Sequence, residues 1–337
     1  MPVKENRYSR QILLPEIGPS GQRKLAKGRA VVIGCGALGT YALGFLVRAG
    51  VGQVVVVDRD IVELSNLQRQ SLFSEKDIGR PKAKAAEEAL RAVNSEIEIW
   101  GVVADVNYAN VEKLVRNATV VIDATDNMDT RFLVNDACVK HGIPWVYAGA
   151  VGTTGMVMPI IPKGPCLRCI FPTVPQPGQL PTCDTVGIVN TLPSAVASLE
   201  VTEVFKIMQG MAPTKELLFV DVWQNEVQHI AVRRNPDCRA CGKADFEFLL
   251  ARKRKFAASL CGRNAVQIVP AEELKGGLSD LRRRLTKSGE AEIRDGVLKF
   301  RAKGGTELTV FPDGRTIVGG TTDLVRAKTI YSRYVGD

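Results

Sequence analysis

The stretch "VVIGCGALGT", Val31–Thr40, decides the fold, because its glycines Gly34, Gly36 and Gly39 directly follow an apolar run. The apolar run predicts a buried strand, and the pattern behind it predicts a helix over residues 38–48. Glycines between a strand and a helix allow a tight turn and bring phosphate groups close to the helix N-terminus. The same glycines would also let helix and strand pack closely without any ligand. We interpret the stretch as a nucleotide-binding loop.

The next strand and the segments that follow it indicate the class of nucleotide. "QVVVVD" ends in Asp58, about twenty residues beyond the glycines, where a carboxylate can accept hydrogen bonds from ribose hydroxyls. An NAD site would need little more, but "SNLQRQ" and "GRPKA" follow and supply Asn66, Arg69 and Lys82. Arginine offers a bidentate fork for phosphate oxygens and lysine a mobile point charge. These residues suit a triphosphate better than a dinucleotide, although isolated charges are often only surface decoration.

Repeated strand and helix patterns fill the first half of the chain. Short apolar runs occur in "RAVVIG", "QVVVVD", "EIEIWGVVAD", "TVVIDAT" and "PWVYAGAVG". This alternation predicts an α/β fold, a Rossmann-like, doubly wound and mainly parallel sheet with helices on both faces. Helices are expected over residues 38–48, 81–92, 111–116 and 129–140.

The composition of the sequence changes after the last of these predicted strands. Residues 159–193 are rich in proline and poor in helix signals, which predicts a long functional loop. A helix over 193–209 and a strand in "ELLFVDVW" follow. A boundary within 245–261 would separate a main domain, residues 1–245, from a small α+β C-terminal module, residues 262–337.

In the C-terminal module we expect a strand, a helix, two or three strands and a final helix. "TVFPDGRTIVGGT" predicts a hairpin that turns at Asp313-Gly314. Its segment "LKGGLSDLRRRLTK", residues 274–287, predicts a basic helix that either docks an acidic carrier or sulfur donor or belongs to a purely structural cap.

Composition indicates an ordinary soluble globular protein of 337 residues, 45% hydrophobic and 24% charged. The sequence contains neither a secretory signal nor an apolar stretch of about 18 residues, so we expect a cytoplasmic protein without a membrane span. The net charge of +9 permits nucleic-acid binding, but much of it lies in "ARKRKF" and "LRRRLTK", where a solvated face or a docking surface is the simpler interpretation. The sequence has only two histidines, which argues against chemistry that rests on several histidines.

Four of the eight cysteines form two Cys-x-x-Cys pairs. In a reducing compartment such pairs favour metal over disulfide, and four thiolates complete the tetrahedral shell of a structural Zn²⁺. Redox dithiols or two ordinary buried pairs are the alternatives. The candidate ligands are Cys166, Cys169, Cys238 and Cys241.

The other four cysteines differ in context. Cys35 in the glycine loop and Cys138 on a helix are most simply small buried residues, and the role of Cys261 is open. Cys183 lies at the end of the proline-rich loop, just ahead of a helix whose N-terminus would lower the pKa of its thiol.

The motifs "RYSRQ", "GCGALG", "SNLQRQ", "GRPKA" and "DATDNMDTR", in this order, resemble those of the ubiquitin-activating (E1-like) adenylyltransferases. The resemblance covers residues 6–245 and is closest to the bacterial enzymes that activate the sulfur-carrier proteins of thiamin and molybdopterin synthesis (ThiF/MoeB type). It implies that Asp58 binds the ATP ribose and that Asn66, Arg69 and Lys82 contact the phosphates. It further implies that Asp126 holds Mg²⁺, whereas the residues alone allow Asp126 or Asn127 simply to cap the next helix.

Three further implications concern assembly and transfer. Arg10 resembles an arginine that reaches into the site of a partner protomer, which implies a homodimer. The two Cys-x-x-Cys pairs correspond to a zinc site that ties the loop region to the main domain. Cys183 matches the position of a conjugating or sulfur-transferring cysteine, so it either forms a thioester or acyl disulfide or is an inert loop residue.

The resemblance therefore implies Mg-ATP-dependent adenylation of a ubiquitin-fold sulfur-carrier protein at its C-terminal Gly-Gly, with release of pyrophosphate. A persulfide from a separate donor, a cysteine desulfurase or a rhodanese, would then give a thiocarboxylate. One rival is a tRNA threonylcarbamoyladenosine dehydratase-like homologue, which generally lacks the two cysteine pairs. The others are an NAD-dependent oxidoreductase, which leaves "SNLQRQ" and "GRPK" unexplained, and a pseudo-enzyme scaffold, although no motif residue is missing.

Overall fold

The structure, a computed structural model, describes residues 7–175, 179–250, 257–259, 264–270, 274 and 276–336. The chain divides into two compact units, residues 1–251 and 252–337. The first unit contains two layers of hydrophobic core and the second contains one.

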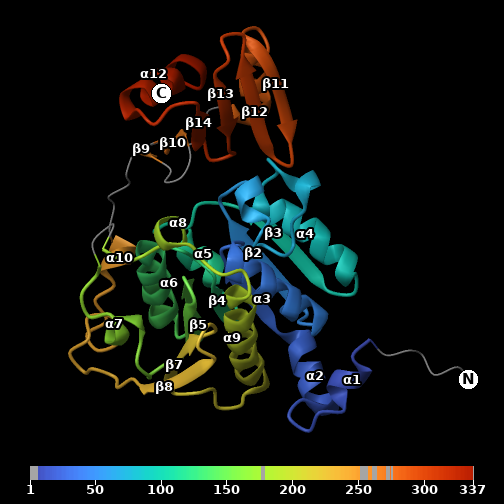
Figure 1. Cartoon of the computed structure of the whole chain (residues 1–337), viewed down its shortest axis with the longest axis vertical. Coiled ribbons are helices and arrows are strands. Elements are labelled where there is room, and N and C mark those ends of the chain that lie inside the picture. Colours follow the sequence, from blue (N-terminus) through green and yellow to red (C-terminus); the bar gives the residue numbers. More distant parts are fainter. Residues whose placement is uncertain are drawn as a thin grey trace, which may run out of the picture. The chain divides into compact units, whose positions relative to one another are not determined.

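An eight-stranded sheet organises the first unit, in the order β3-β2-β1-β4-β5-β6-β7-β8 (Figure 1). The five strands from β3 to β5 are parallel, and β6, β7 and β8 continue the sheet in antiparallel fashion. The predicted mainly parallel, Rossmann-like sheet is therefore confirmed. Its strands are β1 (Arg29–Ile33), β2 (Gln53–Asp58), β3 (Glu98–Val103), β4 (Val120–Asp123), β5 (Trp145–Val151), β6 (Thr154–Ile160), β7 (Glu216–Asp221) and β8 (Glu226–Ala231).

The helices predicted over 38–48, 81–92, 111–116, 129–140 and 193–209 are all present, with ends that differ by at most one residue. The short helices α7 and α8 interrupt the proline-rich segment, which is therefore not one featureless loop. The helices of this unit are α1 (Ser9–Ile12), α2 (Gly18–Lys27), α3 (Ala37–Arg48), η1 (Leu64–Asn66), η2 (Glu75–Asp77), α4 (Lys82–Val93), α5 (Val111–Val115), α6 (Met128–His141), α7 (Leu167–Ile170), α8 (Cys183–Val186), α9 (Leu192–Gln209) and α10 (Glu247–Leu250).

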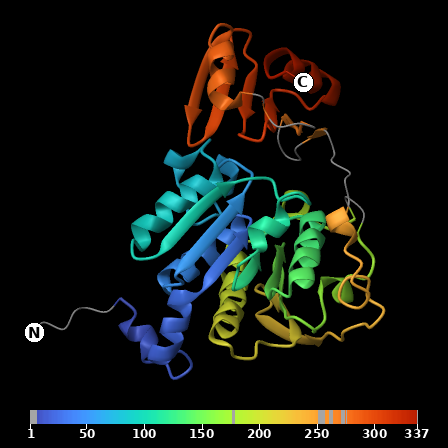
Figure 2. The ribbon, with the colours of Figure 1, turned by 180° about the vertical axis from the view of Figure 1, so that it is seen from behind.

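Side-chain alternation along the strands creates the two core layers, and helices cover both faces of the sheet (Figures 1 and 2). In β1, Ala30 and Val32 pack with α3, α4 and α9, whereas Val31 and Ile33 pack on the other face with α5 and α6. Helix α6 ends at Gly142, whose φ of 64° is the left-handed conformation that glycine adopts at little cost. Helices on both faces leave the carboxyl edge of the parallel strands for the site.

The second unit is an antiparallel sheet in the order β11-β12-β13-β14-β10-β9, with α11 and α12 contributing to one core. The hairpin predicted at Asp313-Gly314 is confirmed, since β13 and β14 pair antiparallel and Gly314 has a φ of 81°. Four strands follow α11, so the prediction of two or three was too low. The elements are β9 (Ala257–Ser259), β10 (Ala265–Ile268), α11 (Gly277–Leu285), β11 (Gly289–Arg294), β12 (Val297–Ala302), β13 (Glu307–Val310), β14 (Thr316–Gly319) and α12 (Leu324–Tyr334).

Among the residues that the structure describes, no helix combines the length and the apolar character that crossing a membrane requires.

Candidate functional site

The three glycines of the loop after β1 differ in what their missing side chains allow. A Cβ at Gly34, where φ is 99°, would lie 2.4 Å from the carbonyl oxygen of Ala124, and one at Gly39 would lie 2.2 Å from that of Gly34. At Gly34 and Gly39 the missing side chain therefore allows close packing of the backbone, which is the alternative role that the sequence left open for these glycines. A Cβ at Gly36 would meet nothing nearer than Gln70 Nε2 at 4.0 Å. Gly36 therefore leaves open space beside the N-terminus of α3, which has no side-chain cap.

Asp58 fastens this loop to the neighbouring strand. Its Oδ2 accepts a 2.6 Å hydrogen bond from the Cys35 backbone N–H, and its Oδ1 accepts one of the same length from the Asp60 N–H. Burial raises the pKa of the Asp58 carboxyl, and the charge of Lys82 opposes that rise. Each carboxylate oxygen can accept a second bond, so hydroxyl groups of a ribose could still be held here.

Lys82 supplies a buried cation at the same edge. It is the first residue of α4, is 5% exposed, and its Nζ lies 4.0 Å from Asp60 Oδ2. Its backbone N–H donates to the Asp60 carbonyl oxygen at 2.8 Å. Lys82, Asp58 and the glycine loop are thus one connected group.

The turn that contains "SNLQRQ" lies against the glycine loop. Asn66 is 5% exposed and its Oδ1 accepts the Glu63 N–H at 3.1 Å, which closes η1. Arg69 Nη1 donates to the Ser65 carbonyl oxygen at 2.9 Å. This partner is uncharged, so the contact does not neutralise the positive charge of the guanidinium group. Sequence reasoning missed Gln70, which is 3% exposed and has no hydrogen-bond partner for Oε1 in the described part of the chain.

Two neighbouring residues of the loop after β4, Asp126 and Asn127, have different contacts. Asn127 caps α6, because its Oδ1 accepts the Thr130 N–H at 2.8 Å. Asp126 is exposed and makes no hydrogen bond to any described residue, although the charges of Arg59 and Arg131 lie near it. Asn127 rather than Asp126 is therefore the cap.

Sequence reasoning also missed the pair that holds this loop in place. Arg131 Nε lies 3.1 Å from Asp123 Oδ2, and its Nη2 donates to the carbonyl oxygens of Thr125 at 2.7 Å and Ala148 at 3.1 Å. Burial raises the pKa of the Asp123 carboxyl in spite of Arg131. A strand-ending aspartate with an arginine in the next helix, both within "DATDNMDTR", was the available signal.

A second carboxyl group lies in the core near this pair. Glu200 of α9 is fully buried, and neither carboxyl oxygen has a hydrogen-bond partner among the described residues. Burial, with the charge of Asp123 added, raises the pKa of Glu200 well above its usual value. The environment of Glu200 therefore favours the protonated form of its carboxyl group.

Arg10 does not join this group within one chain. It is exposed on α1, whose neighbouring Gln11 Nε2 donates to the carbonyl oxygen of Ala49 at 3.0 Å. Ala49 lies at the C-terminal end of α3, while the glycine loop lies at the other end of this 12-residue helix, about 18 Å away.

Cys183 lies at the carboxyl edge of the sheet. It is the first residue of α8, is partly buried, and its Sγ lies 3.6 Å from the carbonyl oxygen of Ala150 near the end of β5. Burial raises the pKa values of the Cys35 and Cys138 thiols, consistent with small core residues. Cys261 lies outside the described residues.

The two Cys-x-x-Cys pairs meet on one side of the sheet. All four Sγ atoms lie within 4.8 Å of one another, with Cys166 to Cys238 at 3.6 Å and Cys169 to Cys241 at 3.5 Å. A tetrahedral zinc ion with Zn–S bonds of about 2.3 Å would place its sulfurs about 3.8 Å apart. A hydrogen bond from Cys166 lowers the pKa of Cys169 to about 4. The cluster is able to hold a metal ion.

Known proteins resemble this chain both in sequence and in structure. Residues 8–240 match the model of the ThiF family. The chain is 43% identical over 335 residues to the sulfur carrier protein ThiS adenylyltransferase of Bacillus subtilis (strain 168), covering 98% of this chain and 99% of that one. It is 42% identical over 240 residues to the SAMP-activating enzyme E1 of Haloferax volcanii, covering 71% and 89%. Among solved structures, E. coli MccB with ATP is 25% identical with a TM-score of 0.62, covering 71% and 75%. The resemblance found in the sequence is confirmed, and the chain belongs to the ThiF family.

Proposed function

We propose that this protein is an ATP-dependent adenylyltransferase that joins AMP to the C-terminal glycine of a ubiquitin-like sulfur-carrier protein. The observation that carries the proposal is the 43% identity along nearly the whole chain to an enzyme named for that activity. The glycine loop, Asp58 and Lys82 support it, because they form one connected group at the carboxyl edge of the sheet. We assign the activity to residues 1–245.

In this reaction a carboxylate oxygen of the carrier attacks the α-phosphorus of ATP. The bond from that phosphorus to the oxygen bridging it to the β-phosphorus breaks, and pyrophosphate leaves with the electron pair. The reaction brings anions together, so positioning and cationic side chains do most of the work. Asp58 would hold the ribose, while Asn66, Arg69 and Lys82 would contact the phosphates.

Asp126 is the residue we assign to Mg²⁺, which would neutralise phosphate charge when bound with ATP. Its exposure, and the capping of α6 by Asn127 instead, support this assignment. The Arg131–Asp123 pair would fix the loop in which Asp126 stands.

We assign Arg10 to the site of a partner protomer, in a homodimer. Its exposed position on α1, at the far end of α3 from the glycine loop, supports a role outside its own site. The four clustered cysteines are assigned to a structural zinc ion. None of the described cysteines forms a disulfide, which fits a cytoplasmic protein.

Cys183 is assigned a covalent step after adenylation. Its sulfur would bond to the carbonyl carbon of the acyl-adenylate while AMP leaves with the electron pair of the broken C–O bond, giving a thioester and releasing the thiol proton to water. If Cys183 first carries a persulfide sulfur from a separate donor, the same displacement of AMP gives an acyl disulfide. Wild-type rates of sulfur transfer in Cys183→Ala would refute the covalent role.

The test of the activity is ATP–pyrophosphate exchange with purified full-length protein and a ubiquitin-fold protein that ends in Gly-Gly. Exchange should require both the carrier and Mg²⁺. A thermal shift provides a partner-free complement, because a ligand at about 100 times its Kd adds about 2.7 kcal/mol of stability. Stabilisation by NADH and not by Mg-ATP would overturn the proposal.

A further inference from the structure

The positive charge of this protein is concentrated in the C-terminal unit. Residues 252–337 contain 18 Lys and Arg against 10 Asp and Glu, whereas residues 1–251 contain 27 against 26. The smaller unit thus carries +8 of the formal net charge of +9. A unit of this charge attracts anionic partners over distances of about 10 Å at ordinary salt.

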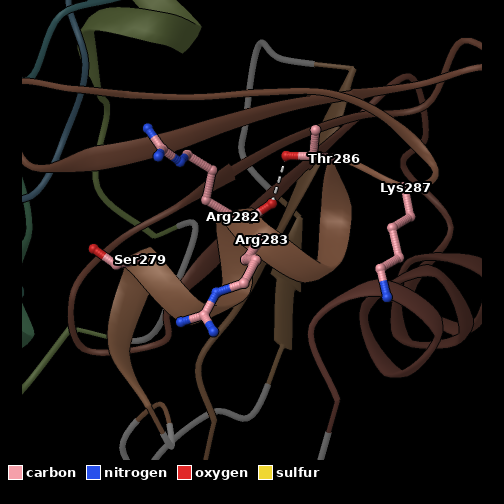
Figure 3. Close-up of a pocket in the computed structure, with 5 residues that line it drawn as sticks. All are labelled: Ser279, Arg282, Arg283, Thr286 and Lys287. Atoms are coloured by element: carbon pink, nitrogen blue, oxygen red, sulfur yellow. Dashed lines mark hydrogen bonds between the residues drawn. The ribbon is translucent and has the colours of Figure 1, made fainter.

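Helix α11 gathers part of this charge on its outer face. Leu281 and Leu285 point into the core of the unit. The other face lines a hollow of about 480 Å³ with residues that recur at helical spacing (Figure 3). These residues, which we call the basic face of α11, are Ser279, Arg282 and Arg283 of the helix and Thr286 and Lys287, which directly follow its end.

Few acidic groups neutralise the basic face. Arg283 pairs with Asp280 at 2.5 Å, but both side chains are largely exposed, and such pairs hold weakly. Arg282 and Lys287 form no ion pair within the described part of the chain. On the neighbouring strand β11, Ala291 and Ile293 pack on the core that α11 covers, and the exposed Glu290 and Glu292 alternate with them. The two glutamates therefore point to the opposite face of the sheet from α11.

The arrangement favours a protein surface over a single small anion. Figure 3 shows Arg282 and Arg283 pointing away from each other, with Lys287 apart from both. Cations that diverge in this way are placed to meet several carboxylates of a folded partner rather than to converge on one phosphate.

Single-stranded nucleic acid is disfavoured because such binders stack bases on exposed aromatic rings. In the described part of this unit, Phe300, Phe311 and Tyr331 are at most 4% exposed, and Tyr334 packs on Phe300 at 5.1 Å between ring centroids. The unit therefore offers charge without a stacking platform.

Relatives show that this unit is an addition to the adenylating part. The ThiS adenylyltransferase of Bacillus subtilis matches 98% of this chain, whereas the SAMP-activating enzyme E1 matches 240 residues that make up 89% of its own length. A relative that is named as an activating enzyme therefore has no room, beside the matched part, for a full counterpart of the C-terminal unit, which points to a role of this unit in binding rather than in chemistry.

We propose that the basic face of α11 binds an acidic surface of the sulfur-carrier protein and so holds the substrate on the enzyme. The inference rests on the proposed function, because it takes the carrier as the substrate. A second contact on the same chain raises the effective concentration of the carrier at the adenylating unit.

The test compares two charge reversals in the full-length protein. Arg282→Glu/Arg283→Glu changes the basic face, and Arg326→Glu/Lys328→Glu makes the same change in charge on the exposed side of α12. The probe is the ubiquitin-fold protein ending in Gly-Gly that supports ATP–pyrophosphate exchange, and the readouts are KM for that protein, KM for ATP, kcat and the melting temperature. Circular dichroism of both variants checks that they are folded.

We expect the basic-face variant to raise KM for the carrier by about fivefold or more at low salt, with little change at high salt, because charge contacts of this kind are screened. Its kcat and its KM for ATP should equal those of the control. Equal carrier KM in both variants would overturn the proposal. A normal carrier KM with slower sulfur transfer from a persulfide donor would also overturn it, and would assign the face to the donor. Absence of carrier-dependent exchange in the wild type would instead refute the proposed function.

Discussion

The carboxylate of Asp58 accepts a 2.6 Å hydrogen bond from the backbone N–H of Cys35, so the last residue of β2 determines the position of the glycine loop after β1. The group proposed to hold the ribose therefore also shapes the loop proposed to hold the phosphates. Binding and loop geometry depend on one side chain.

Asp58→Asn tests this double dependence. The amide group places a donor against the N–H of Cys35 or Asp60, so we expect a loss of about 1–3 kcal/mol in the free energy of unfolding and loss of stabilisation by Mg-ATP. Asp221→Asn is the matched control, because Asp221 ends β7 and its Oδ1 accepts the N–H groups of Trp223 and Gln224. Thermal melts with and without Mg-ATP measure both effects, and an unchanged Mg-ATP shift in Asp58→Asn would contradict the assignment.

Alanine at two loop glycines separates packing from ligand space. Gly34→Ala should lower the melting temperature strongly, because its Cβ would clash with backbone and its φ is positive. Gly36→Ala has room in the protein, so it should melt near the wild-type temperature but respond less to Mg-ATP. If Gly36→Ala kept the full response, the space beside Gly36 would not be the nucleotide site.

Mixed dimers test the assignment of Arg10. Arg10→Ala and Lys82→Ala should each be nearly inactive in carrier-dependent pyrophosphate exchange. If the two variants assemble at random, half of the dimers are mixed. If Arg10 serves the partner's site, each mixed dimer has one intact site out of two, so about a quarter of wild-type activity should return. Co-expression of the two variants with different affinity tags gives the sample. Absence of recovery would show that Arg10 acts in the site of its own protomer, and wild-type activity of Arg10→Ala alone would place Arg10 outside the reaction.

The titration of Asp136 predicts a pH dependence of stability. This carboxyl accepts the Phe248 N–H at 3.1 Å, and burial raises its pKa from 3.8 to about 6. The folded state thus favours the protonated form, so its contribution is complete below about pH 4 and is lost as pH rises through about 6. Relative to Asp136→Asn, the wild type should lose up to about 3 kcal/mol between pH 4 and pH 7.

Urea unfolding at the two pH values measures this difference. Asp129→Asn, an exposed change on the same helix, should show no such trend. An equal difference between wild type and Asp136→Asn at both pH values would show that the buried carboxyl does not titrate in this range.

Loss of one cysteine ligand tests the zinc assignment. Cys169→Ser should abolish bound zinc and lower the melting temperature, because a structural zinc ion contributes directly to folding. Cys183→Ser should retain the wild-type zinc content. Metal analysis of fresh protein should give about one zinc per chain, and a clearly lower content would refute the assignment.

The parallel half of the sheet was predictable from sequence because its strands are buried, apolar and separated by amphipathic helices. β6 was missed because Gly155 and Pro159 lie within it, two residues that usually weaken a strand signal. The structure explains Gly155, where a Cβ would lie 2.3 Å from a methyl group of Val196 in α9. β8 was missed because all six of its residues are exposed and its burial does not alternate.

The glycine loop and Asp58 were found as motif positions, but the role of Arg131 was not. Its partners Asp123, Thr125 and Ala148 come from two strands and the loop between β4 and α6, so only the folded chain brings them together. The names of the relatives, and not the geometry, distinguish the adenylation interpretation from its NAD-dependent and tRNA-directed rivals.

The capping of α6 by Asn127 has a consequence for how this loop tolerates change. Aspartate caps helices about as well as asparagine, so exchanging residues 126 and 127 would preserve composition, net charge and a capped helix. Yet the exposed carboxylate would then be engaged by the helix N-terminus, and an amide would stand where Asp126 now stands. Two residues that any substitution table treats as near equivalents are thus distinguished here by their order alone.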